Sequence, residues 1–230
     1  MQAVCAGDYL NKEKFVGNNY LPMFCITLKH KRCKSRQESF YASATKYNWE
    51  FEFFFGSDCL DKSLNRFYKE EKCLDTGFKA SPAEIACAMS HRNLLKKIIS
   101  DENEYTIVCE DDVEISRSGP QLIPSHEFDI LFLNTRCKHN NYGELWGASC
   151  CGTDSYLITL KGAKKIVKML EKSRVLRLPI DMLILSQSLS LRTMGHHICK
   201  HQDNELSDIY AYHADPISIV NESHKSLLEH

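Results

Sequence analysis

The sequence predicts an α/β fold with a mostly parallel central sheet flanked by helices. Short apolar runs alternate with longer segments that carry apolar residues at helical spacing, as in chains whose strands alternate with helices. A strongly marked helix start lies at Ser81-Pro82, and an apolar run at 106–109 leads directly into three acidic residues. Ligands of such sheets bind at the carboxyl ends of the strands, so the acidic residues mark the expected binding side.

The expected strands are short apolar runs bounded by proline, glycine or polar residues. The run MFCITL follows Pro22, and the aromatic run FEFFF ends at Gly56. β-Branched and aromatic residues are typical of strands, and proline and glycine mark their ends. The expected strands are 23–28, 51–55, 106–109, 128–133 and 155–159.

The clearest helix is expected to begin at Ser81, which can cap the helix, with Pro82 at the first helical position. Glu84 is placed to reach back to the cap, as in a capping box. Five residues of this segment share one face at helical spacing: Cys87, His91, Leu94, Leu95 and Ile98. The expected helices are 31–48, 81–100, a segment opened by Gly162-Ala163 and running to about 172, and one that starts at Pro179.

Composition excludes several classes of protein. Hydrophobic residues make up 43% of the 230 residues and charged residues 26%, which is ordinary for a globular domain with a sizeable core. The formal net charge is −1, which argues against a nucleic-acid partner, because such proteins carry a strong basic excess. No run of about 18 apolar residues occurs, so we expect no transmembrane segment.

The cysteines indicate a reducing compartment. All eleven are scattered without matched C-x2-C pairs, which disfavours a zinc ribbon and a disulfide framework. The only adjacent pair is Cys150-Cys151. Residues 1–20 carry charged side chains and no apolar stretch of about 7–15 residues, so we expect no secretory signal. We therefore expect reduced thiols and a cytoplasmic location, and peripheral membrane association stays open.

Three consecutive carboxylates, Glu110, Asp111 and Asp112, are the most informative feature of the sequence. Like charges in a row are costly unless they are solvated or bind a cation. If the strand stays extended through this segment, Glu110 and Asp112 point to the same side. Two carboxylates at a strand end suit a hard cation such as Mg²⁺ or Mn²⁺, which can neutralise a departing diphosphate. The alternative is an acidic loop exposed to water.

Several motifs together resemble glycosyltransferase family 25, which includes lipooligosaccharide and collagen glycosyltransferases. They occur in the family's order between about residue 23 and residue 209. Two positions depart from the family pattern: Thr27 stands where the family usually has Asn, and Asp154 where it often has His. The motifs are SPAEIACAMSH at 81–91, VCEDDV at 108–113, GTDSYLIT at 152–159 with Gly162-Ala163, PID at 179–181, ITL at 26–28 with Arg32 and Arg36, QD at 202–203 and SDI at 207–209.

The resemblance implies a GT-A-like fold with a Rossmann-type sheet and a metal-dependent, inverting hexosyltransferase. Its cofactor would be Mn²⁺ or Mg²⁺, its donor a UDP-sugar and its acceptor a saccharide or glycoconjugate. Galactose is the leading sugar, and lipooligosaccharide biosynthesis fits the expected location. The implied domains are an N-terminal extension at 1–22, a glycosyltransferase domain at 23–209, a C-terminal tail at 210–227 and a tag or cloning-scar remnant at 228–230.

Individual residues receive roles from this resemblance. Glu110 and Asp112 would hold the metal, Asp111 would support or contact the ribose, and Asp181 would be the catalytic base. The alternative for Asp181 is a carboxylate that caps a helix N-terminus. If Asp181 is not the base, Asp154 and Asp203 are the next candidates.

The remaining site candidates each have a structural alternative. Thr27 would lie near the nucleotide, and Arg32 or Arg36 would contact the diphosphate or the uridine, although their basic run at 29–36 is equally typical of a solvated helix face. His91 is a candidate donor-binding residue or a satisfied core histidine that shapes the site through a hydrogen bond. His201 and His213 are candidates for completing the metal shell.

Two other functions compete with the transferase. One is a catalytically inactive module of the same fold that still binds a sugar nucleotide or glycan; the intact acidic triplet and Asp181 oppose it. The other is a metal-dependent nuclease, which also clusters carboxylates. A nuclease would prefer a lysine shortly after the acidic residues, and the nearest one is Lys138.

Overall fold

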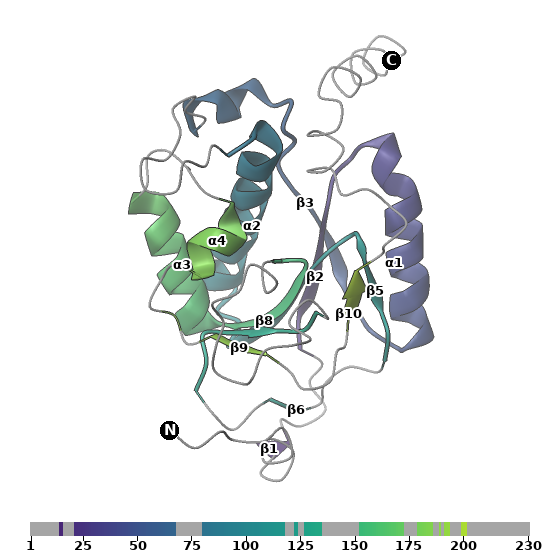
Figure 1. Ribbon diagram of the computed structural model, residues 1–230. Coiled ribbons are helices and arrows are strands. Elements are labelled where there is room, and N and C mark those ends of the chain that lie inside the picture. Colours follow the sequence, from purple (N-terminus) through teal and green to yellow (C-terminus); the bar gives the residue numbers. More distant parts are fainter. Residues whose placement is uncertain are drawn as a thin grey trace.

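A six-stranded sheet forms the centre of the protein (Figure 1), with strand order β3-β2-β4-β8-β7-β9. The computed structural model describes residues 14–15, 21–67, 80–117, 122–123, 127–134, 152–172, 179–185, 189, 191–193 and 199–201. The strands are β2 (Met23–Thr27), β3 (Glu52–Phe55), β4 (Tyr105–Glu110), β7 (Ile130–Phe132), β8 (Ser155–Thr159) and β9 (Leu191–Thr193).

The sheet is mostly parallel. Strand β2 pairs in parallel with both β3 and β4, and β7 pairs in parallel with β9. Strand β8 runs the other way, because it pairs antiparallel with both of its neighbours, β4 and β7. The predicted α/β class with a mostly parallel sheet between helices is confirmed, and all five expected strands are present within a residue or two.

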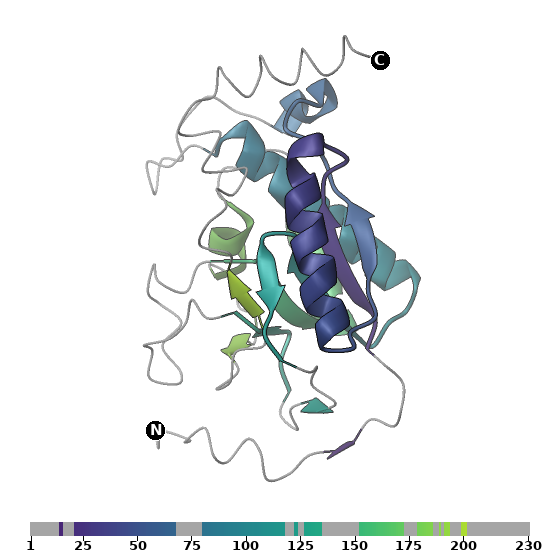
Figure 2. The same ribbon diagram turned by 90° about the vertical axis from the view of Figure 1, so that its right-hand side faces the viewer.

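Helices cover both faces of the sheet (Figure 2). Successive side chains along each strand point to opposite faces and so contribute to two hydrophobic cores, one on each face. On one face, α2 (Pro82–Ser100), α3 (Leu160–Lys172) and the short α4 (Ile180–Leu185) pack on a cluster that includes Phe24, Ile26 and Val108. On the other face, α1 (Lys34–Lys46) packs through Phe40 and Ala44 on a cluster that includes Met23 and Cys25. Neighbouring residues of β2 thus point to opposite layers, as the period of a strand requires.

Short elements complete the described structure. A 3-10 turn, η2 (Lys31–Cys33), leads into α1, so the helix expected over 31–48 is divided in two. A second, η3 (Lys62–Phe67), follows β3. Strand β5 (Val113–Ile115) pairs antiparallel with β10 (Cys199–His201), and β1 (Lys14–Phe15) pairs antiparallel with β6 (Leu122–Ile123). Residues 14–15 of the expected N-terminal extension therefore pair with a segment of the expected domain.

The start of α2 has the predicted capping box. The Ser81 hydroxyl accepts a hydrogen bond from the Glu84 backbone N–H at 3.2 Å, and the Glu84 carboxylate accepts one from the Ser81 N–H at 2.7 Å. Pro82 occupies the first helical position, where its missing N–H costs nothing. Helix α3 begins two residues before the expected Gly162, because the Thr159 hydroxyl accepts from the Gly162 N–H at 2.9 Å and caps the first turn.

The described segments contain no helix that is both long and apolar enough to cross a membrane. Six cysteines lie in these segments, and none of the six forms a disulfide: Cys25, Cys33, Cys59, Cys87, Cys109 and Cys199. The remaining cysteines, including the Cys150-Cys151 pair, lie outside the described residues, as do Lys138, Asp203, His213 and all of 202–230.

Gly162 gives a stability prediction whose sign opposes helix propensity. An alanine Cβ at this position would lie 2.4 Å from the backbone carbonyl oxygen of Asp129, which cannot swing away as a flexible side chain could. Glycine to alanine inside a helix ordinarily stabilises by about 0.5–1 kcal/mol. We expect Gly162→Ala instead to destabilise by about 1–3 kcal/mol, as overpacking does. Urea unfolding measures the effect, with the exposed Lys164→Ala of the same helix as control; a stabilised Gly162→Ala protein would contradict the contact.

Candidate active site

One cleft opens at the carboxyl ends of the parallel strands β3, β2 and β4, beside the first half of α2. Its empty space is about 620 Å³, a volume that includes open solvent at its mouth. The residues around it are Ile26, Thr27, Leu28, Arg32, Arg36, Ser57, Cys59, Ala83, Ala86, Cys87, Ser90, His91, Glu110, Asp111 and Asp112. Its place at the strand ends agrees with the general rule for open α/β sheets.

Close packing between the end of β3 and α2 forms one wall of this cleft. The Ser90 hydroxyl donates to the Ala86 carbonyl oxygen at 2.8 Å and accepts from the Ser57 N–H at 2.8 Å. A side chain on Gly56 would meet the Ser90 oxygen at 2.4 Å, so only glycine allows this approach. The helix and the strand end are thereby held together where the cleft begins.

A buried ion pair forms another wall. The Arg36 Nε lies 3.0 Å from an Asp111 carboxylate oxygen, and both side chains are less than a tenth exposed. The Thr27 hydroxyl donates to the other Asp111 oxygen. The Gln37 side-chain amide then donates to the Thr27 hydroxyl and to the Leu28 carbonyl oxygen, each at 2.9 Å. Asp111 is thus fixed between β2 and α1, with its charge neutralised by Arg36.

The two arginines of the basic run, Arg32 and Arg36, differ from its lysines in their exposure to solvent. Lys29, Lys31 and Lys34 are exposed, as a solvated helix face predicts. Arg36 is buried and Arg32 half-buried, and both contribute to the cleft. The solvated-face interpretation therefore holds for the three lysines, and contact of Arg32 or Arg36 with the diphosphate or the uridine stays a prediction.

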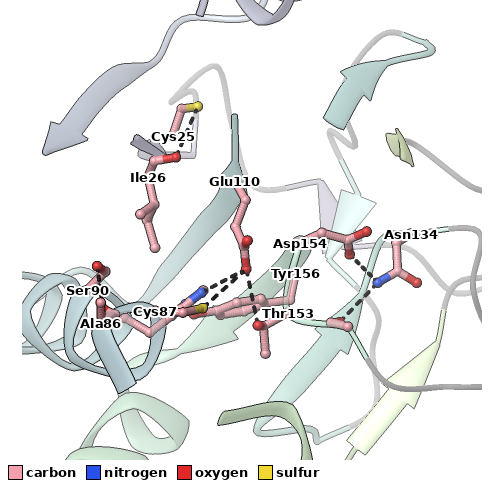
Figure 3. Close-up of polar contacts among 12 residues, drawn as sticks. Cys25, Ile26, Ala86, Cys87, Ser90, Glu110, Asn134, Thr153, Asp154 and Tyr156 are labelled. Atoms are coloured by element: carbon pink, nitrogen blue, oxygen red, sulfur yellow. Dashed lines mark hydrogen bonds and ion pairs between the residues drawn. The ribbon is translucent and has the colours of Figure 1, made fainter. Parts of the chain in front are cut away.

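Glu110 is the centre of a polar cluster at the end of β4 (Figure 3). One of its carboxylate oxygens, Oε1, lies 3.1 Å from His91 Nε2, 3.2 Å from the Thr153 hydroxyl and 4.0 Å from the Cys87 sulfur. The other ring nitrogen of His91, Nδ1, lies 2.8 Å from the Tyr156 hydroxyl. His91 is fully buried with both ring nitrogens hydrogen-bonded, so it has the features of a satisfied core histidine, the structural alternative expected for this residue.

The expected extended geometry of the acidic triplet is wrong. Strand β4 ends at Glu110, and Asp111 and Asp112 form a turn before β5 begins at Val113. Side-chain alternation along a strand therefore cannot align Glu110 with Asp112. The turn occurs because Asp111 is drawn toward Arg36 and Thr27, across the edge of the sheet.

Asp112 lies in a region of excess negative charge. Burial raises the pKa of its carboxyl group well above the usual value, and the charges of Glu110, Asp154 and Asp111 raise it further, opposed by Arg36. Glu110 and Asp112 thus lie close enough to interact despite the turn. Asp154 is held beside them, because its backbone oxygen accepts from the Glu110 N–H at 2.7 Å and its carboxylate accepts from the Asn134 amide.

A family model described as glycosyltransferase family 25 (LPS biosynthesis protein) matches residues 21–184. This range runs from the residues before β2 to within α4 and contains every residue of the cleft. The chain belongs to glycosyltransferase family 25. Of its predicted motifs, those at 202–203 and 207–209 lie beyond the matched range.

Individual proteins show more distant similarity to this family 25 chain. A Haemophilus influenzae strain Rd protein, named as a glycosyltransferase, is 27% identical over 195 residues, which cover 76% of this chain and 65% of that protein. A solved glycosyltransferase involved in glycosylation of the major capsid of PBCV-1 aligns with TM-score 0.48 and 7% identity, over 86% of this chain and 100% of its own.

Two further solved structures align with similar scores. The glycosyltransferase GlyE of Streptococcus pneumoniae TIGR4 gives TM-score 0.45 and 12% identity over 91% of this chain and 64% of its own. The galactosyltransferase LgtC, solved with donor and acceptor sugar analogues, gives TM-score 0.44 and 12% identity. The alignment covers 88% of this chain and 96% of LgtC. Residue roles do not transfer at such identities.

Seven of the eight predicted site residues lie around this cleft: Thr27, Arg32, Arg36, His91, Glu110, Asp111 and Asp112. Asp181 does not line it. This residue lies half-buried in the first turn of α4, and its carboxylate accepts from the Met182 N–H at 2.7 Å. It is nevertheless near the cleft, since its negative charge contributes to the raised pKa of the Cys87 thiol. His201 pairs with Val113 in the β10–β5 register, and Val113 is the residue that follows the acidic turn.

Four residues of the site were missed as functional candidates. Thr153, Tyr156 and Cys87 surround Glu110 and His91, and Gln37 supports Thr27. Cys87 and His91 lie four residues apart on one helix face, and this spacing is a sequence signal that the two side chains could act together. The same spacing also fits an apolar helix face, which is how the sequence pattern is interpreted above. Thr153 and Tyr156 lie in the Gly-Thr segment, and their contacts with Glu110 and His91 depend on the β4–β8 pairing.

The charge excess around Asp112 gives an electrostatic prediction. Because the folded-state pKa of Asp112 is raised, ionising it at neutral pH costs stability when no divalent ion is present. We expect Asp112→Asn to raise the free energy of unfolding of the metal-free protein. The difference from wild type should shrink on acidification toward the ordinary value of 3.8, where the folded wild-type carboxyl is protonated.

Asp129→Asn is the matched control. Asp129 is equally buried, but its carboxylate lies 2.6 Å from the Lys165 ammonium, so neutralising it removes an attraction. We expect this variant to lose about 1–3 kcal/mol, the usual worth of a hydrogen bond to a charged group. Urea unfolding in chelator at several pH values measures both variants. Destabilisation of Asp112→Asn at neutral pH would show that repulsion among the like charges does not control the stability at this position.

Proposed function

We propose that this family 25 chain transfers galactose from a UDP-sugar to a hydroxyl group of a saccharide or glycoconjugate, with inversion at the anomeric carbon and with a divalent metal ion. The observation that carries the proposal is the cleft at the strand ends, which joins two arginines to consecutive carboxylates. A nucleoside diphosphate needs cationic groups, acceptors for its ribose hydroxyls and a divalent counter-ion. Arginines supply the first, and carboxylates can accept from the hydroxyls and hold the ion.

Arg32 and Asp111 are the proposed contacts for the nucleotide. We assign the diphosphate to Arg32, which lines the cleft and is half-buried, and give Arg36 and Thr27, which both contact the Asp111 carboxylate, the role of orienting Asp111. A carboxylate has about four lone-pair sites. Asp111 therefore keeps acceptor capacity for a ribose hydroxyl after binding Arg36 and Thr27. His91 has the role of positioning Glu110 through the contact between its Nε2 and the carboxylate.

Glu110 and Asp112 are the proposed ligands of Mn²⁺ or Mg²⁺. The fit rests on the donor set: burial and the nearby charges of Glu110, Asp154 and Asp111 raise the pKa of Asp112, so carboxylate oxygens gather at this point. Carboxylate oxygens are the ligands that hard divalent cations prefer. When bound, the ion supplies positive charge that stabilises the departing diphosphate.

Asp181 is the proposed base that takes the proton of the acceptor hydroxyl. A base must be ionised and able to reach the acceptor. Asp181 is half-buried at the start of α4, whereas the competing Asp154 is only 2% exposed and accepts from Asn134. We therefore expect an acceptor to reach Asp181 more readily than Asp154.

The biological setting is also proposed. The family description as an LPS biosynthesis protein supports a lipooligosaccharide-type acceptor. The absence of disulfides among the six described cysteines is consistent with a reducing compartment, which supports action in the cytoplasm. We propose 23–209 as the catalytic domain, preceded by an extension at 1–22 and followed by a tail at 210–227.

The metal site predicts nucleotide-selective, cation-dependent stabilisation. UDP with Mn²⁺ should raise the melting temperature of the wild-type protein, and UDP with EDTA should not, since the diphosphate then lacks its counter-ion. Asp112→Asn should remove the effect. Glu114→Gln, an equal change of charge at an exposed position two residues along, should keep it. Equal stabilisation by UDP, GDP and CDP, or full stabilisation in EDTA, contradicts the proposed donor site.

The base predicts a separation of binding from turnover. Asp181→Asn keeps the shape of the side chain but cannot accept the proton, so transfer should fall by about 10²-fold or more. UDP–Mn²⁺ stabilisation should be unchanged, because Asp181 does not line the cleft. Asp154→Asn tests the competing base in parallel. The rate of UDP release from UDP-galactose with acceptor mixtures measures turnover, and NMR of the product gives its anomeric configuration.

Each alternative result has a specific meaning. A wild-type rate in Asp181→Asn assigns the base elsewhere, and lost folding assigns Asp181 a purely structural role. Wild-type protein that binds UDP–Mn²⁺ but neither hydrolyses nor transfers the donor would be the inactive binding module.

A further inference from the structure

We propose that Cys87, His91 and Glu110 form a second metal site, selective for Zn²⁺, at the junction of α2 and β4. The three donor atoms, Cys87 Sγ, His91 Nε2 and Glu110 Oε1, all lie within 4.8 Å of one another. Two of the separations are 3.1 Å and 4.0 Å. Tetrahedral zinc with bonds of about 2.0–2.3 Å holds its ligands about 3.3–3.8 Å apart, so small side-chain shifts suffice.

Rigid elements carry these ligands. Cys87 and His91 are four residues apart in α2, so their side chains lie one above the other on the same helix face. Glu110 is the last residue of β4, which is hydrogen-bonded on both sides within the sheet. The helix start is fixed by its capping box and by the Ser90–Ser57 hydrogen bond. A site on such elements needs little reorganisation to bind an ion.

Two outer residues complete the arrangement expected around a zinc ion. Metal-bound histidines ordinarily hydrogen-bond through their second nitrogen, and metal-bound carboxylates are hydrogen-bonded too. Here the Tyr156 hydroxyl contacts His91 Nδ1 at 2.8 Å, and the Thr153 hydroxyl donates to Glu110 at 3.2 Å. These hydrogen bonds already orient His91 and Glu110 as outer partners orient metal ligands, and the Cys87 sulfur 4.0 Å from Glu110 Oε1 adds the third donor.

The donor set selects the metal. Thiolate and imidazole favour Zn²⁺ over the hard cations Mn²⁺ and Mg²⁺, which prefer oxygen ligands. Three protein ligands leave a fourth position, and all three residues line the cleft, so water can occupy that position. On binding, Cys87 releases its thiol proton to solvent, and the ring proton of His91 must reside on Nδ1, donating to the Tyr156 oxygen.

Zinc would also regulate transfer, and this part rests on the proposed function. Glu110 is common to the zinc site and to the proposed Mn²⁺ site. Zinc bound to Oε1 holds the carboxylate toward α2 and withdraws negative charge from the cleft. Zn²⁺ should therefore weaken the Mn²⁺-dependent binding of UDP and inhibit transfer.

The first experiment measures binding alone. Metal-free protein is titrated with Co²⁺, whose absorption band in the near ultraviolet reports a thiolate ligand, and with Zn²⁺ against a chromophoric chelator. Wild type should bind one Zn²⁺ that Cys87→Ser and Cys87→Ala lose. Cys59→Ser is the matched control, because Cys59 lines the same cleft outside the cluster and should keep the site.

Two results would overturn the site: Co²⁺ spectra without a thiolate band, or Cys87→Ser and Cys87→Ala proteins that bind Zn²⁺ as wild type does. Tyr156→Phe gives an independent check. It should weaken Zn²⁺ binding by about 10-fold or more, the usual cost of losing such a partner. Nitrogen NMR of the Zn²⁺-bound wild type should show the His91 ring proton on Nδ1. A proton on Nε2 in the bound state would also overturn the site.

The second experiment separates regulation from the donor site. UDP–Mn²⁺ stabilisation is measured with and without Zn²⁺ in wild type and Cys87→Ser, each relative to its own zinc-free value. Loss of stabilisation in wild type alone supports the inference. If zinc-free wild type shows no UDP–Mn²⁺ effect, the proposed function fails while the zinc site stands on the first experiment. If Zn²⁺ binds but leaves UDP–Mn²⁺ stabilisation intact, competition through Glu110 is wrong.

Discussion

The buried ion pair between Arg36 and Asp111 is the interaction on which the site depends. It joins α1 to the turn after β4, and Thr27 adds the end of β2 to the same contact. Removing one partner of a buried pair commonly costs about 3–5 kcal/mol, because the other charge is left uncompensated. The pair also neutralises one carboxylate of the acidic triplet, so that Glu110 and Asp112 can remain beside it.

Helix α2 carries out two tasks at once. Its capping box and the close contact at Gly56 fix its start against β3, and its next turn presents Cys87, Ser90 and His91 to the cleft. The apolar residues further along, such as Leu94 and Ile98, lie fully buried in the core between helices and sheet. The chemistry of the helix therefore occupies its first half, while packing along the second half holds it in place.

The acidic triplet divides among three environments although its residues are adjacent. Glu110 is bound by α2 and the start of β8, Asp111 by α1 and β2, and Asp112 lies buried in the field of its neighbours. The proposed hard cation would bind the carboxylate oxygens of Glu110 and Asp112. The proximity of a thiol and an imidazole to Glu110 adds a second, softer donor set at the same carboxylate. One carboxylate common to two kinds of metal site is a simple physical basis for competition between them.

Local chemistry by itself determined the elements of this protein. The capping box at Ser81, the β-branched run before Glu110 and the aromatic run before Gly56 each specify their helix or strand through interactions within a few residues. The family motifs likewise located seven residues that surround one cleft. The tertiary structure alone decided how those residues are engaged. The turn at Asp111 follows from Arg36, which lies 75 positions earlier in the chain, and the environment of His91 follows from Tyr156 and Glu110. Ion pairs and hydrogen bonds between distant segments exist only once the sheet has brought them together, so no local pattern can specify them.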